Sequence, residues 1–326
     1  MCTNKRCKSI SDTPIDDQPM SGRKPLVGLL NNPVVPSVIK YAPDLVEYID
    51  VIPDRLWYDF EHGEVIGQRF HRVTGAIEEL KECARGRVLG GHGIGLSLPS
   101  AIPIDMAMVA EVGSLAKELN LQWYSEHLSM FLVSNGSVPN SQAGLGLPVA
   151  YDEETFEIVS DKLRILRSAV GCDLLLENGA IFTPVPDSEM SEPEFLNRVY
   201  SELDCGTLLD LHNLYVGLLN GVLSPLEYLE KLNPDCVREI HLAGGHELAG
   251  FYTDAHSGPT PSEVWSWAYE FGPRFKNLRA IVFEFHESYF ERLGLGGIAG
   301  ELERMHEFAE VVTSGVQHLE NSAGQC

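Results

Sequence analysis

The sequence has few cysteines for its length, and they are not arranged as a site. Its 326 residues include seven cysteines, an odd number, and no two of them form a Cys-x-x-Cys pair. We therefore expect neither a disulfide framework nor a thiolate metal site. Cys172, Cys205 and Cys236 lie at or just before the start of apolar runs, and we interpret them as small buried residues.

Basic residues are also scarce. The chain carries 24 Lys and Arg against 47 Asp and Glu, which gives a formal net charge of −23. This balance argues against binding to nucleic acid or to an anionic membrane surface, because both need clustered positive charge. An acidic chain can still hold cations.

Long apolar runs and phosphate loops are missing as well. No stretch approaches the roughly 20 apolar residues of a membrane helix, and residues 1–21 lack the apolar core of a signal peptide. We therefore expect a cytoplasmic protein without a membrane segment. The first strand-like run is followed by Asn31-Asn32-Pro33, and His92-Gly-Ile-Gly lacks the third glycine of a nucleotide-binding turn.

What the chain does contain is a regular alternation of strand-like and helix-like segments. The strand-like runs are 25–30, 47–52, 87–92, 121–127, 172–177, 206–212, 237–242 and 279–285. Helical patterns cover 72–84, 105–119, 152–170, 191–203, 224–232, 262–271 and 297–312. Eight such units close most economically into a barrel, so we predict an α/β fold, a single (β/α)8 barrel of the TIM type over residues 25–314. Residues 1–24 and 315–326 are expected to be tails, and an open doubly wound sheet is the alternative fold.

Ionisable side chains stand at the C-terminal ends of the predicted strands. They are His92, His127, Glu177, Asp210, His212, His241 and Glu284, and the loop after the seventh strand adds Asp254 and His256. The strand ends of a β/α barrel converge on one face, where burying so many ionisable groups without a cation would be costly. Side chains two apart on a strand share a face, so we expect Asp210 and His212 to project together. The pattern predicts a metal site at the C-terminal mouth of the strands.

The number of candidate ligands bears on the number of ions. Five imidazoles and four carboxylates exceed the coordination positions of a single ion, so we expect two or three ions. Nitrogen and oxygen donors without thiolate suit iron, manganese or zinc. Donor type alone does not choose among these three metals.

Short motifs surround these candidate ligands. They read His92-Gly-Ile-Gly-Leu-Ser-Leu, Ser125-Glu-His-Leu, Leu176-Glu-Asn, Ser188-Glu-Met-Ser-Glu, Leu209-Asp-Leu-His-Asn-Leu-Tyr-Val, Ile240-His-Leu-Ala-Gly, Thr253-Asp-Ala-His and Val264-Trp. Over about residues 25–290 the chain resembles the multinuclear non-heme iron-dependent oxidases, the family of the methanobactin biosynthesis oxidase. The resemblance implies a barrel that holds two or three irons and uses O2 to modify residues, often cysteine, of ribosomally made precursor peptides. It also implies a small partner protein that handles the leader of the peptide.

The resemblance implies ligand roles for every candidate except His212, which stands where the family usually has Asn. We predict that an imidazole replaces the amide as ligand there. The alternative is that His212 hydrogen-bonds a carboxylate while Asn213 or water takes the ion. Glu126 replaces a common Asp and is expected to orient an imidazole. Asn178, Asn213 and His246 are expected to support the ligands in the same way.

Two further departures from the family lie on the same mouth. Residues 47–53 and Asn31-Asn32-Pro33 differ from its usual segments, which leaves the identity of the substrate open. We predict an oxidase that uses iron and O2, and no protein nucleophile is evident. The alternatives are a manganese or zinc isomerase or phosphodiesterase on the same kind of barrel, and a non-catalytic metal-dependent binding protein, because a barrel does not guarantee chemistry.

Overall fold

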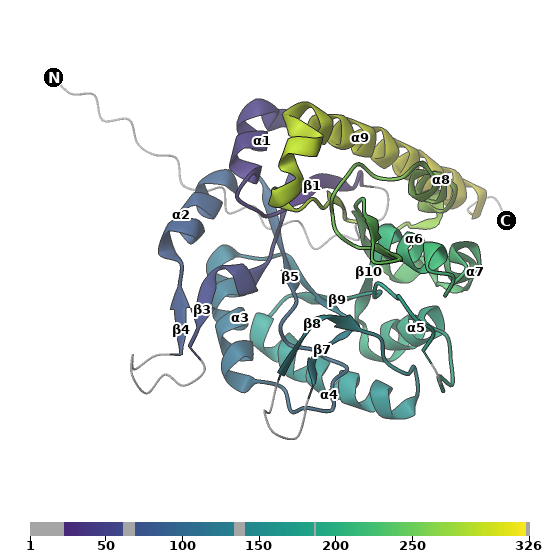
Figure 1. Cartoon of the computed structure of the whole chain (residues 1–326). Coiled ribbons are helices and arrows are strands. Elements are labelled where there is room, and N and C mark those ends of the chain that lie inside the picture. Colours follow the sequence, from purple (N-terminus) through teal and green to yellow (C-terminus); the bar gives the residue numbers. More distant parts are fainter. Residues whose placement is uncertain (1–22, 61–68, 134–140, 186, 324–326) are drawn as a thin grey trace.

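Eight parallel strands close into a barrel (Figure 1). The structure is a computed structural model that describes residues 23–60, 69–133, 141–185 and 187–323. The barrel strands are β1 (Leu26–Leu30), β2 (Tyr48–Val51), β5 (Val88–Gly93), β6 (Trp123–His127), β9 (Asp173–Glu177), β10 (Gly206–Asp210), β11 (Val237–Leu242) and β14 (Ala280–Phe283). Their order around the barrel is β1-β14-β11-β10-β9-β6-β5-β2, and β2 pairs with β1 to close it. The predicted (β/α)8 barrel is confirmed.

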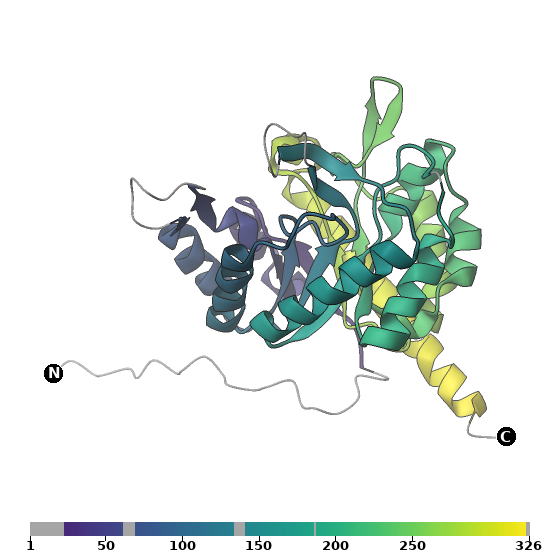
Figure 2. The same ribbon diagram turned by 90° about the horizontal axis from the view of Figure 1, so that it is seen from below.

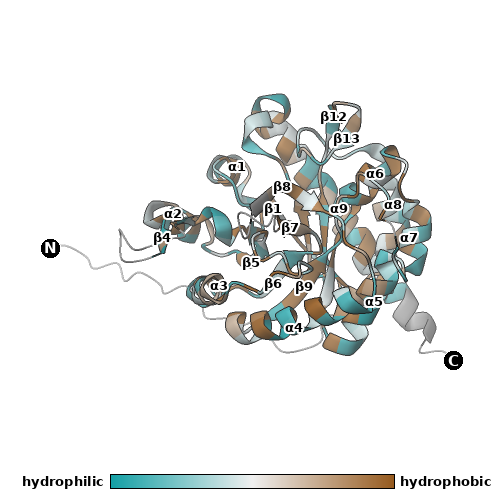
Figure 3. Ribbon diagram, turned by 60° about the horizontal axis from the view of Figure 1, so that its bottom comes forward, coloured by the Kyte–Doolittle hydropathy of each residue, from teal (hydrophilic) through white to brown (hydrophobic). Residues whose placement is uncertain are grey.

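Helices cover the outside of the barrel. They are α1 (Val35–Tyr41), α2 (Thr74–Cys83), α3 (Met106–Leu119), α4 (Glu153–Val170), α5 (Glu192–Leu203), α6 (Leu211–Leu219), α7 (Pro225–Lys231), α8 (Ser262–Phe271) and α9 (Phe290–Ala323). Short 3-10 turns lie at η1 (Pro43–Leu45), η2 (Pro53–Arg55), η3 (Pro234–Cys236), η4 (Gly272–Arg274) and η5 (Glu287–Tyr289). In Figure 3 hydrophilic and hydrophobic residues alternate along the helices, as expected when one face packs on the barrel. Within the described ranges, no helix is long and apolar enough to cross a membrane.

Local sequence explains where the helices begin and end. The carboxylates of Asp105 and Asp152 accept hydrogen bonds from backbone amides in the first turns of α3 and α4. A capping box between Ser191 and Glu194 is present at the start of α5. Helix α4 ends at Val170, and Gly171 after it has a φ of 72°, a left-handed conformation that glycine adopts without strain.

The lower part of the barrel interior is filled by aromatic and aliphatic side chains. The rings of Tyr48 and Trp123 stack with their centroids 5.0 Å apart, and leucine and valine side chains pack around them. Two glycines make room for this stack. A Cβ on Gly28 would lie 2.1 Å from the backbone oxygen of Tyr48, and one on Gly90 would lie 1.7 Å from its hydroxyl. We call this part of the interior the apolar floor. The polar side chains of the strands lie further along, towards the C-terminal ends.

Three hairpins extend the loops on the C-terminal side of the barrel. They pair β3 (Trp57–Asp59) with β4 (Phe70–Arg72), β7 (Met130–Val133) with β8 (Ser141–Leu147), and β12 (His246–Leu248) with β13 (Phe251–Thr253). Figure 2 shows β12 and β13 on the side of the barrel away from the C-terminal end of α9. These hairpins were not predicted, because short strands inside long loops show no clear periodicity in the sequence.

Several boundaries also differ from the prediction. Helices α1 and α6 were not predicted. Helix α9 is longer than the expected 297–312, with a non-helical Gly294 (φ 60°) near its start. The helix also includes residues 315–323, which we predicted as tail. It continues past the predicted end because Val316 is buried against the helix layer and extends the apolar face. Most of the predicted N-terminal tail, residues 1–22, lies outside the described residues.

Candidate metal centre at the barrel mouth

Six predicted ligands from six strands meet at the C-terminal mouth of the barrel. They are His92 on β5, His127 on β6, Glu177 on β9, Asp210 on β10, His241 on β11 and Glu284 just after β14. Ligand atoms lie within 4.8 Å of one another in the sets His92, Glu177 and His241, and Asp210, His241 and Glu284. Each of these two neighbouring sets could hold a cation.

One position lies between Glu177 and two imidazoles. Nε2 of His127 and Nε2 of His92 lie 3.1 and 3.4 Å from Oε2 of Glu177. The other nitrogen of each ring, Nδ1, contacts a polar oxygen on the side away from Glu177. His127 Nδ1 is 3.0 Å from the Gly93 carbonyl, and His92 Nδ1 is 2.8 Å from the Ser125 hydroxyl. Because a carbonyl only accepts hydrogen bonds, the His127 Nδ1–H donates and its Nε2 presents a lone pair to the centre.

The second position lies around Glu284. Nδ1 of His241 is 3.1 Å from Oε1 of Glu284, and Nε2 of His256 is 3.3 Å from its Oε2. These two nitrogens, Oδ2 of Asp210 and Oε2 of Glu177 have no hydrogen-bond partner in the part of the chain that the structure describes. Leaving buried polar atoms unpaired is costly. Buried nitrogen and oxygen atoms that face one another without hydrogen bonds fit a site where cations stand between them.

A third group comes from the loop after β13. Oδ1 of Asp254 lies 3.0 Å from Nε2 of His256 and 2.9 Å from Nδ1 of His212. The other nitrogen of His212, Nε2, lies 3.5 Å from the Tyr252 hydroxyl. One carboxylate oxygen therefore faces two imidazoles, and its contact with Nδ1 of His212 is a hydrogen bond.

His212 reaches this group by a route that we did not predict. Strand β10 ends at Asp210, whose carboxylate accepts the Asn213 backbone N–H at 2.7 Å and caps α6. His212 therefore lies in the first turn of a helix, and the shared strand face that we expected for it and Asp210 was wrong. The helix turns the imidazole towards Asp254.

Two of the four predicted supporting residues form hydrogen bonds to candidate ligands. The Asn178 side-chain amide donates to the backbone carbonyl of Asp210 at 2.9 Å, and its oxygen accepts the Asp210 N–H at 2.8 Å. The Asn213 side-chain amide donates to Oε1 of Glu177 at 3.2 Å. These contacts fix the ends of β9 and β10 relative to each other.

The other two supporting residues do not contact the predicted ligands as we expected. Glu126 lies on the outer face of β6, because consecutive strand residues face opposite sides, and it accepts the Tyr124 hydroxyl hydrogen bond at 2.9 Å. His246 lies in β12, and its Nδ1 is 2.8 Å from the Ser257 hydroxyl. Within the described chain, Ser125 rather than Glu126 orients an imidazole.

Three residues of the site were missed in the sequence. Ser125 precedes His127 by two positions, and Glu239 precedes His241 by two, so each points into the barrel with the ligand that follows it. Asp50 lies on β2 and is fully buried, as is Glu239. A carboxylate inside an apolar strand, two positions before a predicted ligand, is the signal that would have identified Glu239.

Burial and charge shift the acid–base behaviour of the centre. Burial, followed by the charge of Asp210, raises the pKa of Glu177 well above its usual value. Burial and Asp254 raise the pKa of Asp210 to about 7. Burial lowers the pKa of His256, but nearby carboxylates outweigh this effect and raise it to about 10. For His241 too, nearby carboxylates outweigh the effect of burial and raise the pKa well above its usual value. In the metal-free protein, protons therefore compensate the charges of the centre.

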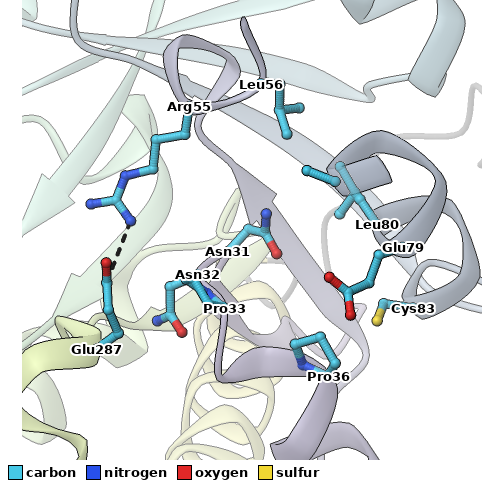
Figure 4. Close-up of a pocket in the computed structure, with 11 residues that line it drawn as sticks. Asn31, Asn32, Pro33, Pro36, Arg55, Leu56, Glu79, Leu80, Cys83 and Glu287 are labelled. Atoms are coloured by element: carbon cyan, nitrogen blue, oxygen red, sulfur yellow. Dashed lines mark ion pairs between the residues drawn. The ribbon is translucent and has the colours of Figure 1, made fainter. Parts of the chain in front are cut away.

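A separate pocket lies beside the mouth at the ends of β1 and β2. It has a volume of about 210 Å³ and is lined by Asn31-Asn32-Pro33, Arg55 and one face of α2 (Figure 4). Arg55 faces Glu287 with their nearest charged atoms 3.7 Å apart. The Asn32 side chain donates to the Phe285 carbonyl at 3.0 Å, which fixes this wall of the pocket.

Comparison with known proteins finds relatives over most of the chain. The profile described as RiPP precursor modification enzyme MbnB/TglH/ChrH matches residues 37–309. A UPF0276 protein of Chromobacterium violaceum is 34% identical over 237 residues, which are 72% of this chain and 82% of the relative. A UPF0276 protein of Acaryochloris marina is 34% identical over 191 residues, which are 59% of this chain and 67% of the relative.

Solved structures share the barrel. A xylose isomerase-like TIM barrel protein from Mycobacterium smegmatis in complex with magnesium gives a TM-score of 0.52 at 15% identity and covers 91% of this chain and 99% of that one. Endonuclease IV from Thermus thermophilus gives 0.51 at 15% identity, with coverage of 88% and 99%. At this identity the likeness shows the fold alone.

Proposed function

The chain belongs to the family of the RiPP precursor modification enzymes MbnB/TglH/ChrH, and on this basis we propose that it is a multinuclear non-heme iron-dependent oxidase. RiPPs are ribosomally made peptides that are modified after translation, so the substrate class is a precursor peptide. In this proposal two or three iron ions and O2 oxidise one residue of the peptide, and cysteine is the first residue to test. A small partner protein that binds the leader of the peptide belongs to the same proposal.

The unpaired, mostly buried ligand atoms at the mouth are the observation that carries the proposal. The proposed ligands are His92, His127, Glu177, Asp210, His212, His241, Asp254, His256 and Glu284. Glu177 faces two imidazoles and Asp254 faces two others. Carboxylates and imidazoles placed in this way would hold the ions, and the all-nitrogen and oxygen donor set fits iron.

Residues of the chain orient and bury the proposed ligands before any ion binds. When bound, iron supplies the activation of O2, which accepts the hydrogen that is removed from the peptide. The Ser125 hydroxyl and the Gly93 carbonyl orient two imidazoles. The ligand carboxylates and imidazoles are at least three-quarters buried, which keeps most water away from them and strengthens their interaction with cations.

Metal content tests the metal part of the proposal. After anaerobic preparation with iron, we expect about two or three irons per chain and visible absorption after exposure to air. Glu284→Gln should lower the iron content, whereas Glu303→Gln, a matched change on the exposed face of α9, should leave it unchanged. A single tightly bound zinc with no iron site would contradict the oxidase and favour the isomerase or phosphodiesterase alternative.

The substrate part needs a peptide. A short cysteine-containing precursor encoded beside the gene should change mass when it is incubated with the iron-loaded protein and its partner, and O2 should be consumed at the same time. A peptide that binds the iron-loaded protein but is never modified in the presence of O2 would favour the non-catalytic binding protein instead.

A further inference from the structure

Two carboxylates lie inside the barrel between the apolar floor and the candidate metal centre. Asp50 on β2 and Glu239 on β11 are both fully buried. One oxygen of each is anchored by the floor, since the Tyr48 hydroxyl donates to Oδ1 of Asp50 at 3.2 Å and the Trp123 indole N–H donates to Oε2 of Glu239 at 2.7 Å. The floor therefore sets the direction in which the other oxygen of each carboxylate points.

Both remaining oxygens face the same ring nitrogen. Nε2 of His241 lies 3.3 Å from Oδ2 of Asp50 and 3.6 Å from Oε1 of Glu239. Within the described chain these two oxygens have no hydrogen-bond partner. The opposite nitrogen of the ring, Nδ1, points to the mouth and lies 3.1 Å from Glu284. The imidazole thus spans the gap between the buried carboxylates and the centre.

His241 differs from the other two strand-end imidazoles in the nitrogen that it presents. His92 and His127 are held through Nδ1 and turn Nε2 to the centre. His241 turns Nδ1 to the centre, so it needs a hydrogen-bond acceptor at Nε2 to keep the proton there. A neutral imidazole carries one N–H and one lone pair, and an ionised carboxylate only accepts.

We propose that Asp50 and Glu239 are positioning residues for His241. Oδ2 of Asp50, the nearer oxygen, would accept the Nε2–H, and the Glu239 carboxylate beside it would favour the same tautomer, so that the Nδ1 lone pair is aimed at the metal. This inference rests on the proposed function, because it takes His241 as a ligand. Acceptors behind a ligand imidazole typically change metal affinity by about 10- to 100-fold.

A cation between Asp50, Glu239 and His241 is the competing interpretation, since one atom of each lies within 4.8 Å of the others. The geometry favours the hydrogen bond. The other carboxylate oxygens are already engaged by Tyr48 and Trp123. Three donor atoms are fewer than the four to six that zinc or magnesium takes. The two interpretations predict opposite states of Nε2, protonated for the hydrogen bond and deprotonated for the cation.

Zinc, a diamagnetic stand-in for iron, allows the ring to be observed directly. The full-length protein is labelled with ¹⁵N-histidine and loaded with Zn(II), and His241→Gln identifies the signals of this ring by their loss. We expect the nitrogen spectrum to show Nε2 protonated and Nδ1 coordinated in the wild-type protein. Asp50→Leu should weaken zinc binding about 10- to 100-fold, measured by competition with a chelator. Asp50→Asn, which keeps a neutral oxygen acceptor, should restore most of the affinity, and Asp161→Asn on the exposed face of α4 should have no effect.

The outcomes separate this inference from the proposed function. A wild-type protein that binds no metal at the mouth would overturn the proposed function itself. A zinc-loaded protein in which Nδ1 of His241 carries the proton would overturn only the positioning role, and so would unchanged affinity in Asp50→Leu. Two results together would show that Asp50, Glu239 and His241 hold a cation instead of a hydrogen bond. These are the loss of one zinc per chain in Asp50→Leu and a deprotonated Nε2 in the wild-type protein. The wild-type spectrum decides the question even if Asp50→Leu fails to fold.

Discussion

Loading the centre with metal should release several protons at neutral pH. Metal ligands must be deprotonated, so every proton held by a ligand in the metal-free protein has to leave when ions bind. Burial and nearby charges raise the pKa of Glu177 and of His241 well above their usual values, and the pKa of His256 is raised to about 10. These shifts favour the protonated forms of all three groups in the metal-free protein.

Asp210 makes the number of released protons depend on pH. Its pKa is raised to about 7, so it holds about half a proton at pH 7. Loading should therefore release more protons below pH 7 than above it. The sign follows directly, because releasing protons makes binding tighter as the pH rises. The overall binding constant should therefore increase by about tenfold or more for each pH unit.

Calorimetry measures this number without a substrate. The metal-free protein is titrated with Zn(II) or Mn(II) in buffers that differ in ionisation enthalpy, and the dependence of the observed heat on that enthalpy gives the protons released. His306→Gln should leave the number unchanged, since this imidazole contacts the Leu45 carbonyl away from the mouth. Release of fewer than about one proton at pH 7 would refute the described charge state of the centre.

Three further changes test the site and the barrel. Burial raises the pKa of Glu192 to about 7, so its stabilising contribution is complete below about pH 4.5 and is lost as the pH rises through 7. Relative to wild type, Glu192→Gln should therefore gain up to about 3 kcal/mol in unfolding free energy between pH 4.5 and pH 8, measured in urea, and a difference that is independent of pH would contradict this. His212→Asn should weaken the ion held by Asp254 while leaving the other ions bound, and unchanged stoichiometry and affinity would show that the imidazole only positions the carboxylate. Gly28→Ala should cost about 1–3 kcal/mol of unfolding free energy, because the new Cβ meets a backbone oxygen of β2 at 2.1 Å. Gly75→Ala on α2, where nothing lies within 4 Å, is the matched control, and equal losses in both variants would refute the packing argument.

The barrel, and the convergence of most candidate ligands at its mouth, could be predicted from the sequence. Apolar runs with one ionisable residue at the end identify a strand and its C-terminal end together, and the topology of a β/α barrel brings such ends to one face whatever their separation in sequence. His92, His127, Glu177 and His241 were found in this way. No contact between them had to be known, because the periodicity of each strand and the closure of the sheet are sufficient.

What depended on tertiary structure was the direction of each side chain and the atom that it presents. The sequence alone does not show that β10 stops at Asp210 and that His212 begins a helix, because the same residues fit a longer strand. Glu126 is next to a ligand in the chain but on the opposite face of β6. Asp50 and Glu239 become neighbours only when the barrel closes, since β2 and β11 are not adjacent strands. Which nitrogen of each imidazole faces the centre depends on what stands behind the ring, and those partners come from other strands and loops.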